Sequence, residues 1–201
     1  NYPNFDHLKS GECWLCWTTS YGNFENIGTI YEYTIFDYKS KIACTRLYNQ
    51  LSMENFEDIL TGVAIPVAQN LNFEAKHLCF FEDYKNIDKQ KDSFLSHIYT
   101  IIQNSGFDIN MHVLKKSDDL IKTEELRKDY THHCLSFLIP FIHKGASFKE
   151  LKIHLQKYIR DYNINHKLSY DGELYSRVEY YVKSTNSEMI LPLWAYIERR
   201  Y

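Results

Sequence analysis

Acidic side chains stand at the ends of two elements that the sequence predicts. Glu82 and Asp83 directly follow a compact apolar run, KHLCFF, and Glu124 and Glu125 open a helical stretch after a further predicted helix and strand. Carboxylates in such positions can meet at one edge of a sheet, where they would hold divalent metal ions for phosphoryl transfer. The helix dipole alone also favours acidic residues at a helix start, so the positions by themselves leave both interpretations open.

A CxxC pair offers a second kind of chemistry. Cys13 and Cys16 have the spacing of zinc ligands, and His77 and Cys79 are candidates for completing a tetrahedral site. Tryptophans flank the two cysteines, and no second CxxC follows at zinc-knuckle spacing. A buried strand explains the same residues without a metal ion.

A third pattern lies within one predicted helix. Arg127 and His132 resemble the Arg-x4-His catalytic pair of HEPN ribonucleases, in which both residues lie on nearby turns. HEPN domains are all-helical, whereas this chain has a pronounced β half. Two polar residues on a solvated helix face account for the pair equally well.

These residues need a scaffold, and its centre is a predicted hairpin at residues 28–49. On its first strand Tyr31, Tyr33 and Ile35 share one face, and Ile30 and Phe36 share the other. Aromatic and β-branched residues in alternation are typical of a half-buried strand. We therefore expect this hairpin at the centre of a sheet.

The remaining pattern alternates between strands and helices. The DYKS stretch at 37–40 predicts a tight turn, because an Asp side chain can bond the backbone ahead of it. Pro66 is expected to end the helix that precedes it, and Pro140 is expected to kink or end its own helix. A capping box begins a helix at Ser147. Strands are predicted at 12–21, 76–81 and 108–114, helices at 52–65, 88–104, 123–139 and 147–162, and a charged linker at 115–122. The tail from 170 to 201 has a mixed pattern that assigns it to neither helix nor strand. The order predicts an α/β fold with an antiparallel hairpin and later βαβ crossovers.

Length and composition limit the number of domains and the classes of function that the chain could have. The 201 residues suit one domain with a sizeable core. A net charge of −3, from 23 Lys and Arg against 26 Asp and Glu, argues against a free-standing high-affinity binder of nucleic acid. It does not exclude a catalytic core whose basic DNA-binding parts lie elsewhere.

The chain carries five cysteines and no apolar run long enough to span a bilayer, and we expect no cleavable leader. We expect a reduced protein of the cytoplasm or nucleus without membrane association. The first residue is Asn1 rather than Met, so we expect an excised fragment or a trimmed form of a longer chain.

Four motifs in order, over residues 10–170, resemble the catalytic core of retroviral-type integrases and their DDE transposase relatives. The hairpin YTIFDYKSKIACTRL is similar to their second and third strands with a D-x-x-S-R turn. CFFEDYKN resembles their strand end with the second catalytic Asp, and DDLIKTEEL their D-N-x-x-x-E start of the catalytic helix. FKELKIHLQKYIRDYNINHKLSY is similar to their closing helix and its Y-N-x-x-R-x-H-x-x-L end. The positions that match are Asp37, Ser40, Lys41, Asp83, Asp119, Glu124, Tyr162, Asn163, His166 and Leu168.

This resemblance implies an RNase H-like mixed sheet flanked by helices, with 1–170 as the core-like domain and 171–201 as its C-terminal extension. It implies Asp83 and Glu124 as the catalytic and metal-binding residues, with Mg²⁺ or Mn²⁺ as the cofactor of an active enzyme. The implied activity is DNA strand transfer. The implied partners are DNA and either further copies of the chain or another protein.

One departure from the family affects the chemistry. The family's first catalytic Asp lies on the first strand in a W-x-x-D-x-T setting, and here Trp17, or Cys16 in a shifted register, takes that position. Glu12 is a candidate substitute. With two carboxylates instead of three, the site should bind metal ions poorly. We therefore hypothesise a degenerate core, and as alternatives a non-enzymatic DNA- or protein-interaction module on the same fold, or an unrelated HEPN-like nuclease.

Overall fold

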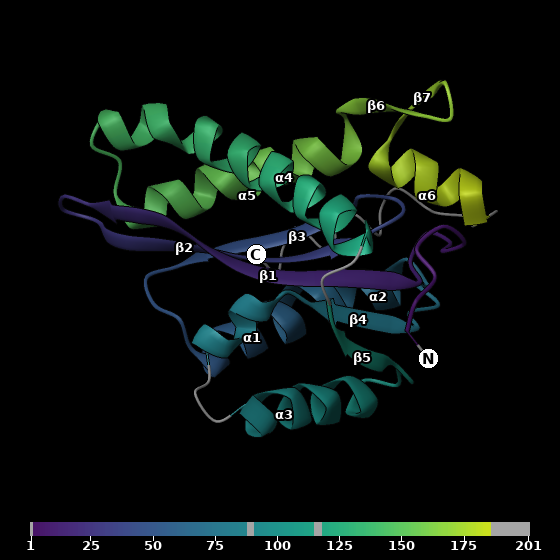
Figure 1. Ribbon diagram of the computed structural model, residues 1–201. Coiled ribbons are helices and arrows are strands. Elements are labelled where there is room, and N and C mark those ends of the chain that lie inside the picture. The colour runs from purple at the N-terminus through teal and green to yellow at the C-terminus, as the bar shows by residue number, and fades with distance from the viewer. Residues whose placement is uncertain (1, 88–90, 115–117, 186–201) are drawn as a thin grey trace.

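A five-stranded sheet lies between two layers of helices in this computed structural model, which describes residues 2–87, 91–114 and 118–185 (Figure 1). The strand order is β3-β2-β1-β4-β5. The strands are β1 (Cys13–Phe24), β2 (Gly28–Asp37), β3 (Ala43–Tyr48), β4 (His77–Phe80) and β5 (Asn110–Val113), and a separate two-stranded sheet pairs β6 (Lys167–Tyr170) with β7 (Glu173–Ser176).

The pairing of the strands is mixed. β1, β2 and β3 form an antiparallel meander, whereas β4 pairs parallel with both β1 and β5. Parallel neighbours need crossover connections, and helices supply them here. The prediction of an α/β fold with an antiparallel hairpin and βαβ crossovers is therefore confirmed.

The alternation of side chains on β2 follows the predicted pattern. Tyr33 and Ile35 belong to the core on one face of the sheet, with Tyr31 packed against it, and Ile30 and Phe36 belong to the core on the other face. The period of two in the sequence therefore fixed which residues face which helical layer.

The two faces of the sheet are covered by different helices (Figure 1). One is covered by the first three α-helices, with α6 at one end, and the other by α4 and α5. The helices are α1 (Met53–Ile59), the π-helical turn η1 (Leu60–Ala64), α2 (Ile65–Asn70), the 3₁₀ turn η2 (Glu82–Asn86), α3 (Lys91–Asn104), α4 (Asp118–His143), α5 (Phe148–Ile164) and α6 (Arg177–Thr185).

The predicted turn after β2 forms around the Asp37 side chain. Its carboxylate accepts hydrogen bonds from the backbone N–H and the hydroxyl of Ser40, at 2.9 and 2.5 Å, and from the N–H of Gly11 at 3.0 Å. Lys41 follows with a φ of 63°. The turn thus joins β2 to β3 and also holds the segment before β1.

Neither proline ends its helix. Pro66 lies in the first turn of α2, directly after the π-helical turn, where the change of hydrogen-bond pattern accommodates its missing N–H. Pro140 lies inside α4, which continues to His143. The ring of Pro140 faces solvent, and the apolar side chains of Leu138 and Phe141 on either side still pack into the core beneath α4 and α5.

The chain after residue 170 is partly described. The β6–β7 hairpin spans the predicted division at 170, and α6 packs on the core beside α2, where the Tyr181 ring contacts Phe73. Residues 186–201 lie outside the described part, as do 88–90 of the helix predicted at 88–104 and 115–117 of the predicted linker. α4 already begins at Asp118, inside that predicted linker. No helix among the described residues is both long and apolar enough to cross a membrane.

Candidate functional site

Asp83 lies just beyond the end of β4 and bonds the neighbouring strand. Its Oδ2 accepts the backbone N–H of Thr18 at 2.6 Å and the Thr18 hydroxyl at 2.8 Å. The parallel pairing of β1 with β4 produces this contact, because the N–H of Phe81 still bonds the carbonyl of Cys16 and carries the chain along β1. The Asp83 side chain is 15% exposed.

Glu124 and Arg127 approach Asp83 from one face of α4. They are three residues apart on the helix, so their side chains are neighbours. Arg127 Nη1 lies 3.2 Å from Asp83 Oδ1 and 3.7 Å from Glu124 Oε1. One nitrogen atom therefore joins the two carboxylates, and the structure brings the two predicted site residues together around it.

The rest of the Arg127 side chain is also held. Nη2 donates to the Thr18 carbonyl at 3.2 Å and to the Thr19 hydroxyl at 3.3 Å, and the guanidinium lies 4.9 Å from the centre of the Phe81 ring. The guanidinium thus ties α4 to the region where β1 and the end of β4 meet. Sequence reasoning assigned Arg127 only to the HEPN pair, because nothing in the chain signals a contact 44 residues away in sequence with Asp83.

Burial is the largest influence on the acidity of Asp83. It raises the pKa of this carboxyl, and the Arg127 charge and the Thr18 hydrogen bonds act in the opposite direction. The ionised form is therefore held by this arginine and this threonine rather than by water.

The donor set does not fit a catalytic divalent cation. Both oxygens of Asp83 already accept hydrogen bonds, and a guanidinium stands between the two carboxylates. Glu82 is 73% exposed and pairs with Lys85, and no group of three or more acidic, His or Cys side chains suited to a metal occurs in the described ranges. Mg²⁺ prefers several oxygen ligands in octahedral arrangement, which this set does not supply.

Trp17 occupies the position where the resemblance places a first Asp. It is 2% exposed and points toward α4, where its ring packs against Phe36, Phe81 and Tyr130. Its indole N–H donates to Glu32 on β2. An aromatic side chain therefore fills the space in which a carboxylate was expected.

Glu32 is a buried carboxylate that the sequence did not single out. It is fully buried and accepts hydrogen bonds from Trp17, Tyr21 and Thr34. Burial raises its pKa, and these donors oppose the increase. The available signal was a charged residue in an otherwise apolar alternation, between two aromatic positions of a central strand.

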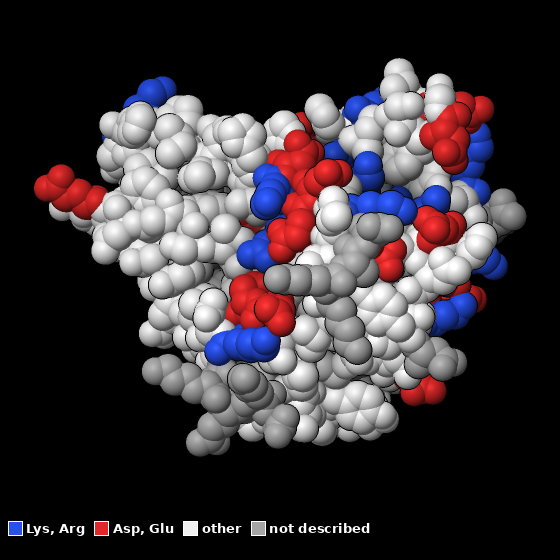
Figure 2. All heavy atoms as spheres, in the orientation of Figure 1, with Lys and Arg blue, Asp and Glu red and all other residues white. Residues whose placement is uncertain are grey.

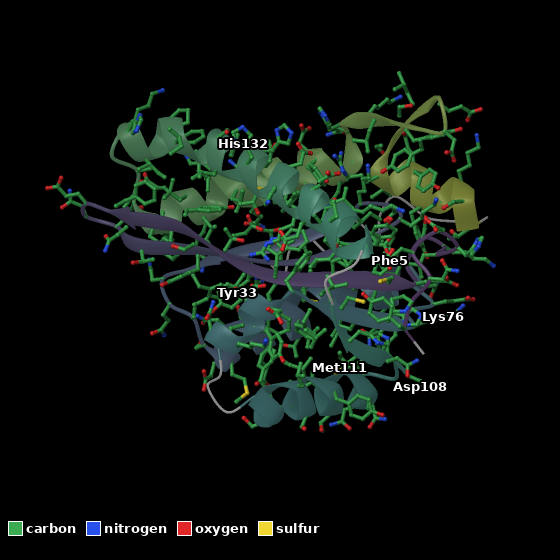
Figure 3. All side chains as sticks on the ribbon, in the orientation of Figure 1. Phe5, Tyr33, Lys76, Asp108, Met111 and His132 are labelled. Atoms are coloured by element: carbon green, nitrogen blue, oxygen red, sulfur yellow. The ribbon has the colours of Figure 1, made fainter. Side chains whose placement is uncertain are left out.

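Glu12 does not replace the missing Asp. It precedes β1, where its carboxylate accepts the N–H of Lys9 and pairs with Lys76. Lys76 lies at the end of the sheet near the N-terminus (Figure 3). Thr18, which bonds Asp83, is six residues further along an extended strand, about 20 Å away at roughly 3.3 Å per residue.

The predicted zinc ligands do not converge. Cys13 and Cys79 face one side of the sheet with their sulfurs 3.7 Å apart, whereas Cys16 faces the other side. His77 instead contacts His112 on β5, with 3.1 Å between ring nitrogens. The burial of the cysteines supports the alternative of a strand core.

The HEPN pair does not converge either. Arg127 points toward the sheet, and His132 projects from the outer side of α4, away from the sheet (Figure 3). The five-stranded sheet is also incompatible with an all-helical HEPN domain. The geometry argues against this interpretation.

The central mixed sheet, with α4 and α5 on one face and the first three α-helices on the other, is an integrase-like fold. The magnesium-bound catalytic core of HTLV-2 integrase matches in its dimeric form with a TM-score of 0.58 and 9% identity, over 87% of this chain and 98% of that one. Its trimeric form matches with 0.59 and 10% over the same shares. A chain of the simian T-cell lymphotropic virus intasome in complex with PP2A regulatory subunit B56 gamma matches with 0.59 and 11%, over 87% of this chain and 55% of that one. No family model and no curated protein matches the sequence.

Proposed function

We propose that this chain is an integrase-like core in which Arg127 has taken the place of a catalytic cation, and that it serves as a non-enzymatic interaction module. The observation that carries the proposal is the single guanidinium nitrogen in contact with both Asp83 and Glu124. The roles of these two residues as metal ligands or catalysts, predicted from the sequence, are not part of the proposed function.

A guanidinium can stand in for a bound cation at such a site. It supplies a permanent positive charge and directional donors that match carboxylate oxygens. The charge repulsion between Asp83 and Glu124 is thereby offset without a metal ion. Trp17, on the strand where a further carboxylate was expected, adds no ligand to the site.

A protein partner is favoured over DNA. The chain has more acidic than basic residues, and a DNA-binding surface needs the opposite. Figure 2 shows acidic and basic side chains interleaved along the middle of one face, with no broad basic area among the residues described there. DNA, predicted from the resemblance, remains the alternative partner.

Self-association is the second form that this role could take. The HTLV-2 integrase catalytic core occurs in a dimeric and a trimeric form. Sedimentation of this chain over a range of concentrations measures the property directly.

The proposed loss of strand transfer is tested with DNA. The chain is incubated with nicked or hairpin DNA and Mg²⁺ or Mn²⁺, alongside Asp83→Ala and the adjacent exposed control Glu82→Ala. We expect no cleavage or joining by any of the three proteins. Robust cleavage that Asp83→Ala abolishes and Glu82→Ala retains would refute the proposal.

A further inference from the structure

Two adjoining cavities open between α4 and the C-terminal part of the described chain. The smaller, of about 400 Å³, lies where α4, the end of α5 and the start of α6 meet. The larger, of about 660 Å³, lies between α4, the β2–β3 turn and the β6–β7 hairpin. Lys41, Leu126 and Asp129 line both, so the two cavities form one groove. Figure 2 shows the surface hollowed between α4 and this hairpin.

Arg177 is a buried cation in the wall of the smaller cavity. The residue is 5% exposed, and its guanidinium carbon lies 3.2 Å from the centre of the Tyr162 ring. Nη1 donates to the carbonyls of Tyr162 and His166 at 2.7 and 3.3 Å, whereas Nε has no hydrogen-bond partner among the described residues. An arginine is rarely buried to this extent unless a negative charge pairs with it.

Lys41 brings a second cation to the same cavity. Its ammonium lies 5.9 Å from the centre of the Tyr170 ring, whose hydroxyl donates to the Ser40 carbonyl. Burial and the nearby charge of Arg177 lower the pKa of Lys41, and the charge of Asp129 opposes them. The two cations therefore repel each other at this cavity.

The backbone of Lys41 is a second, independent observation. Its φ of 63° lies in the left-handed region, which glycine adopts at little cost and which other residues avoid. Strained backbone of this kind gathers at functional sites. A glycine would suit the turn better, so the turn itself does not explain a lysine here.

The carboxylates nearby leave both cations without a partner. Asp129 and Asp161 line the smaller cavity, but Asp129 lies 3.3 Å from His133. Asp161 accepts a hydrogen bond from the Asn165 side chain at 3.0 Å. In the part of the chain that the structure describes, no carboxylate forms an ion pair with either cation. A bound anion would supply the missing negative charge.

We propose that the smaller cavity binds the phosphate group of a phosphorylated side chain in a partner protein. The Lys41 ammonium contacts the phosphate, and Arg177 adds positive charge from the cavity wall. The larger cavity gives room to the residues that flank the phosphorylated one. The inference rests on the proposed role as an interaction module and names the class of partner.

The walls of the groove disfavour a nucleic acid. Four carboxylates line the larger cavity, those of Asp6, Glu125, Asp129 and Asp171. A DNA strand carries a phosphate at every nucleotide and would meet these carboxylates along its length. A peptide with one phosphate places its dianion at Lys41 alone.

Phosphotyrosine and phosphoserine, each capped at both ends, are the probes, and they are titrated into the ¹⁵N-labelled chain beside their unphosphorylated forms. We expect shifts at the amides of Lys41, His133 and His166 with a phosphorylated probe and none with the unphosphorylated forms. Asp129→Asn removes an exposed negative charge from the cavity and should tighten binding about twofold.

Lys41→Gly is the decisive variant, because glycine suits the left-handed backbone and the protein should stay as stable as the original chain. It should weaken binding about tenfold or more through the loss of the ammonium. Lys39→Ala in the same turn is the control, since Lys39 lines only the larger cavity, and it should bind as the original chain does.

Several results would overturn the assignment. Absence of binding by both phosphorylated probes, or binding that Lys41→Gly leaves unchanged, would remove the site. Inorganic phosphate that binds as tightly as the capped residues would assign the site to the free ion, and single-stranded DNA that displaces a bound probe would assign it to nucleic acid. The titration needs no metal, so DNA cleavage would refute the proposed function without affecting this result.

Discussion

At the scale of single residues, one arginine decides what the candidate site can do. Asp83 is bonded to Thr18 and Arg127 through both of its oxygens, so its contacts are those of a residue that stabilises the fold. In a metal site without its ion, the carboxylate would instead repel its acidic neighbours. The two roles predict opposite effects of removing the charge.

Asp83→Ala should lower the free energy of unfolding by about 2–4 kcal/mol, because it leaves the partly buried Arg127 without its closer carboxylate partner and Thr18 without its acceptor. Denaturant unfolding measures the change. The control Glu82→Ala removes an exposed carboxylate and should change stability by less than about 0.5 kcal/mol. An unchanged or more stable Asp83→Ala protein would indicate a site built from mutually repelling carboxylates.

Asp37 should make stability depend on pH. Burial raises the pKa of this carboxyl to about 6, from an ordinary value of 3.8. The folded chain therefore holds a proton that the unfolded chain has released between these values, and stability should fall as pH rises from about 4 to about 6. The contribution is about 3 kcal/mol at most.

Unfolding of the original chain and of Asp37→Asn at several pH values isolates this contribution. The difference in stability between the two should shrink as pH rises through the window, because only the original chain loses the Asp37 contribution. Glu32 and Asp83 titrate in both proteins, so their effects cancel in the comparison. A difference that does not vary between pH 4 and 6 would show that Asp37 stays ionised in the fold.

At the scale of elements, the contact between α5 and the sheet edge depends on Asn163. This residue is 1% exposed and satisfies both outward backbone groups of Ala43. It is one of the positions that resemble the closing helix of the integrase core. The structure gives that position a physical role in fixing α5 along β3.

Asn163→Ala should lower the free energy of unfolding by about 2 kcal/mol or more, because two peptide groups lose their partner. Hydrogen exchange at the Ala43 amide should become faster. The nearby Asn165→Ala removes only a bond to exposed Asp161 and serves as the control. Equal effects of the two substitutions would contradict this role.

Local sequence patterns predicted the helices and strands, but they did not predict contacts between residues far apart in the chain. The alternation in β2, the turn at Asp37 and the capping box at Ser147 are local, and the structure confirms each. The sequence could place Asp83 and Glu124 at element ends, yet it could not show Arg127 between them. Pro140 does not end α4, because packing on the sheet outweighs one missing hydrogen bond.

At the scale of the whole molecule, the integrase-like fold is kept while the chemistry of its centre differs from what the resemblance implied. Trp17 and its ring contacts fill part of that centre, and Arg127 joins the two remaining carboxylates.

Binding of Mn²⁺ distinguishes a guanidinium that takes the place of a metal ion from a site that still holds one. Mn²⁺ is titrated calorimetrically into the original chain, Arg127→Ala, Asp83→Ala and the variant with both substitutions. We expect no binding at the Asp83 site of the original chain. Arg127→Ala, which removes the guanidinium from both carboxylates, should bind weakly through Asp83 Oδ1 and Glu124, and adding Asp83→Ala to it should remove that binding. Mn²⁺ binding by the original chain that Asp83→Ala abolishes would contradict the proposal that Arg127 takes the place of a catalytic cation.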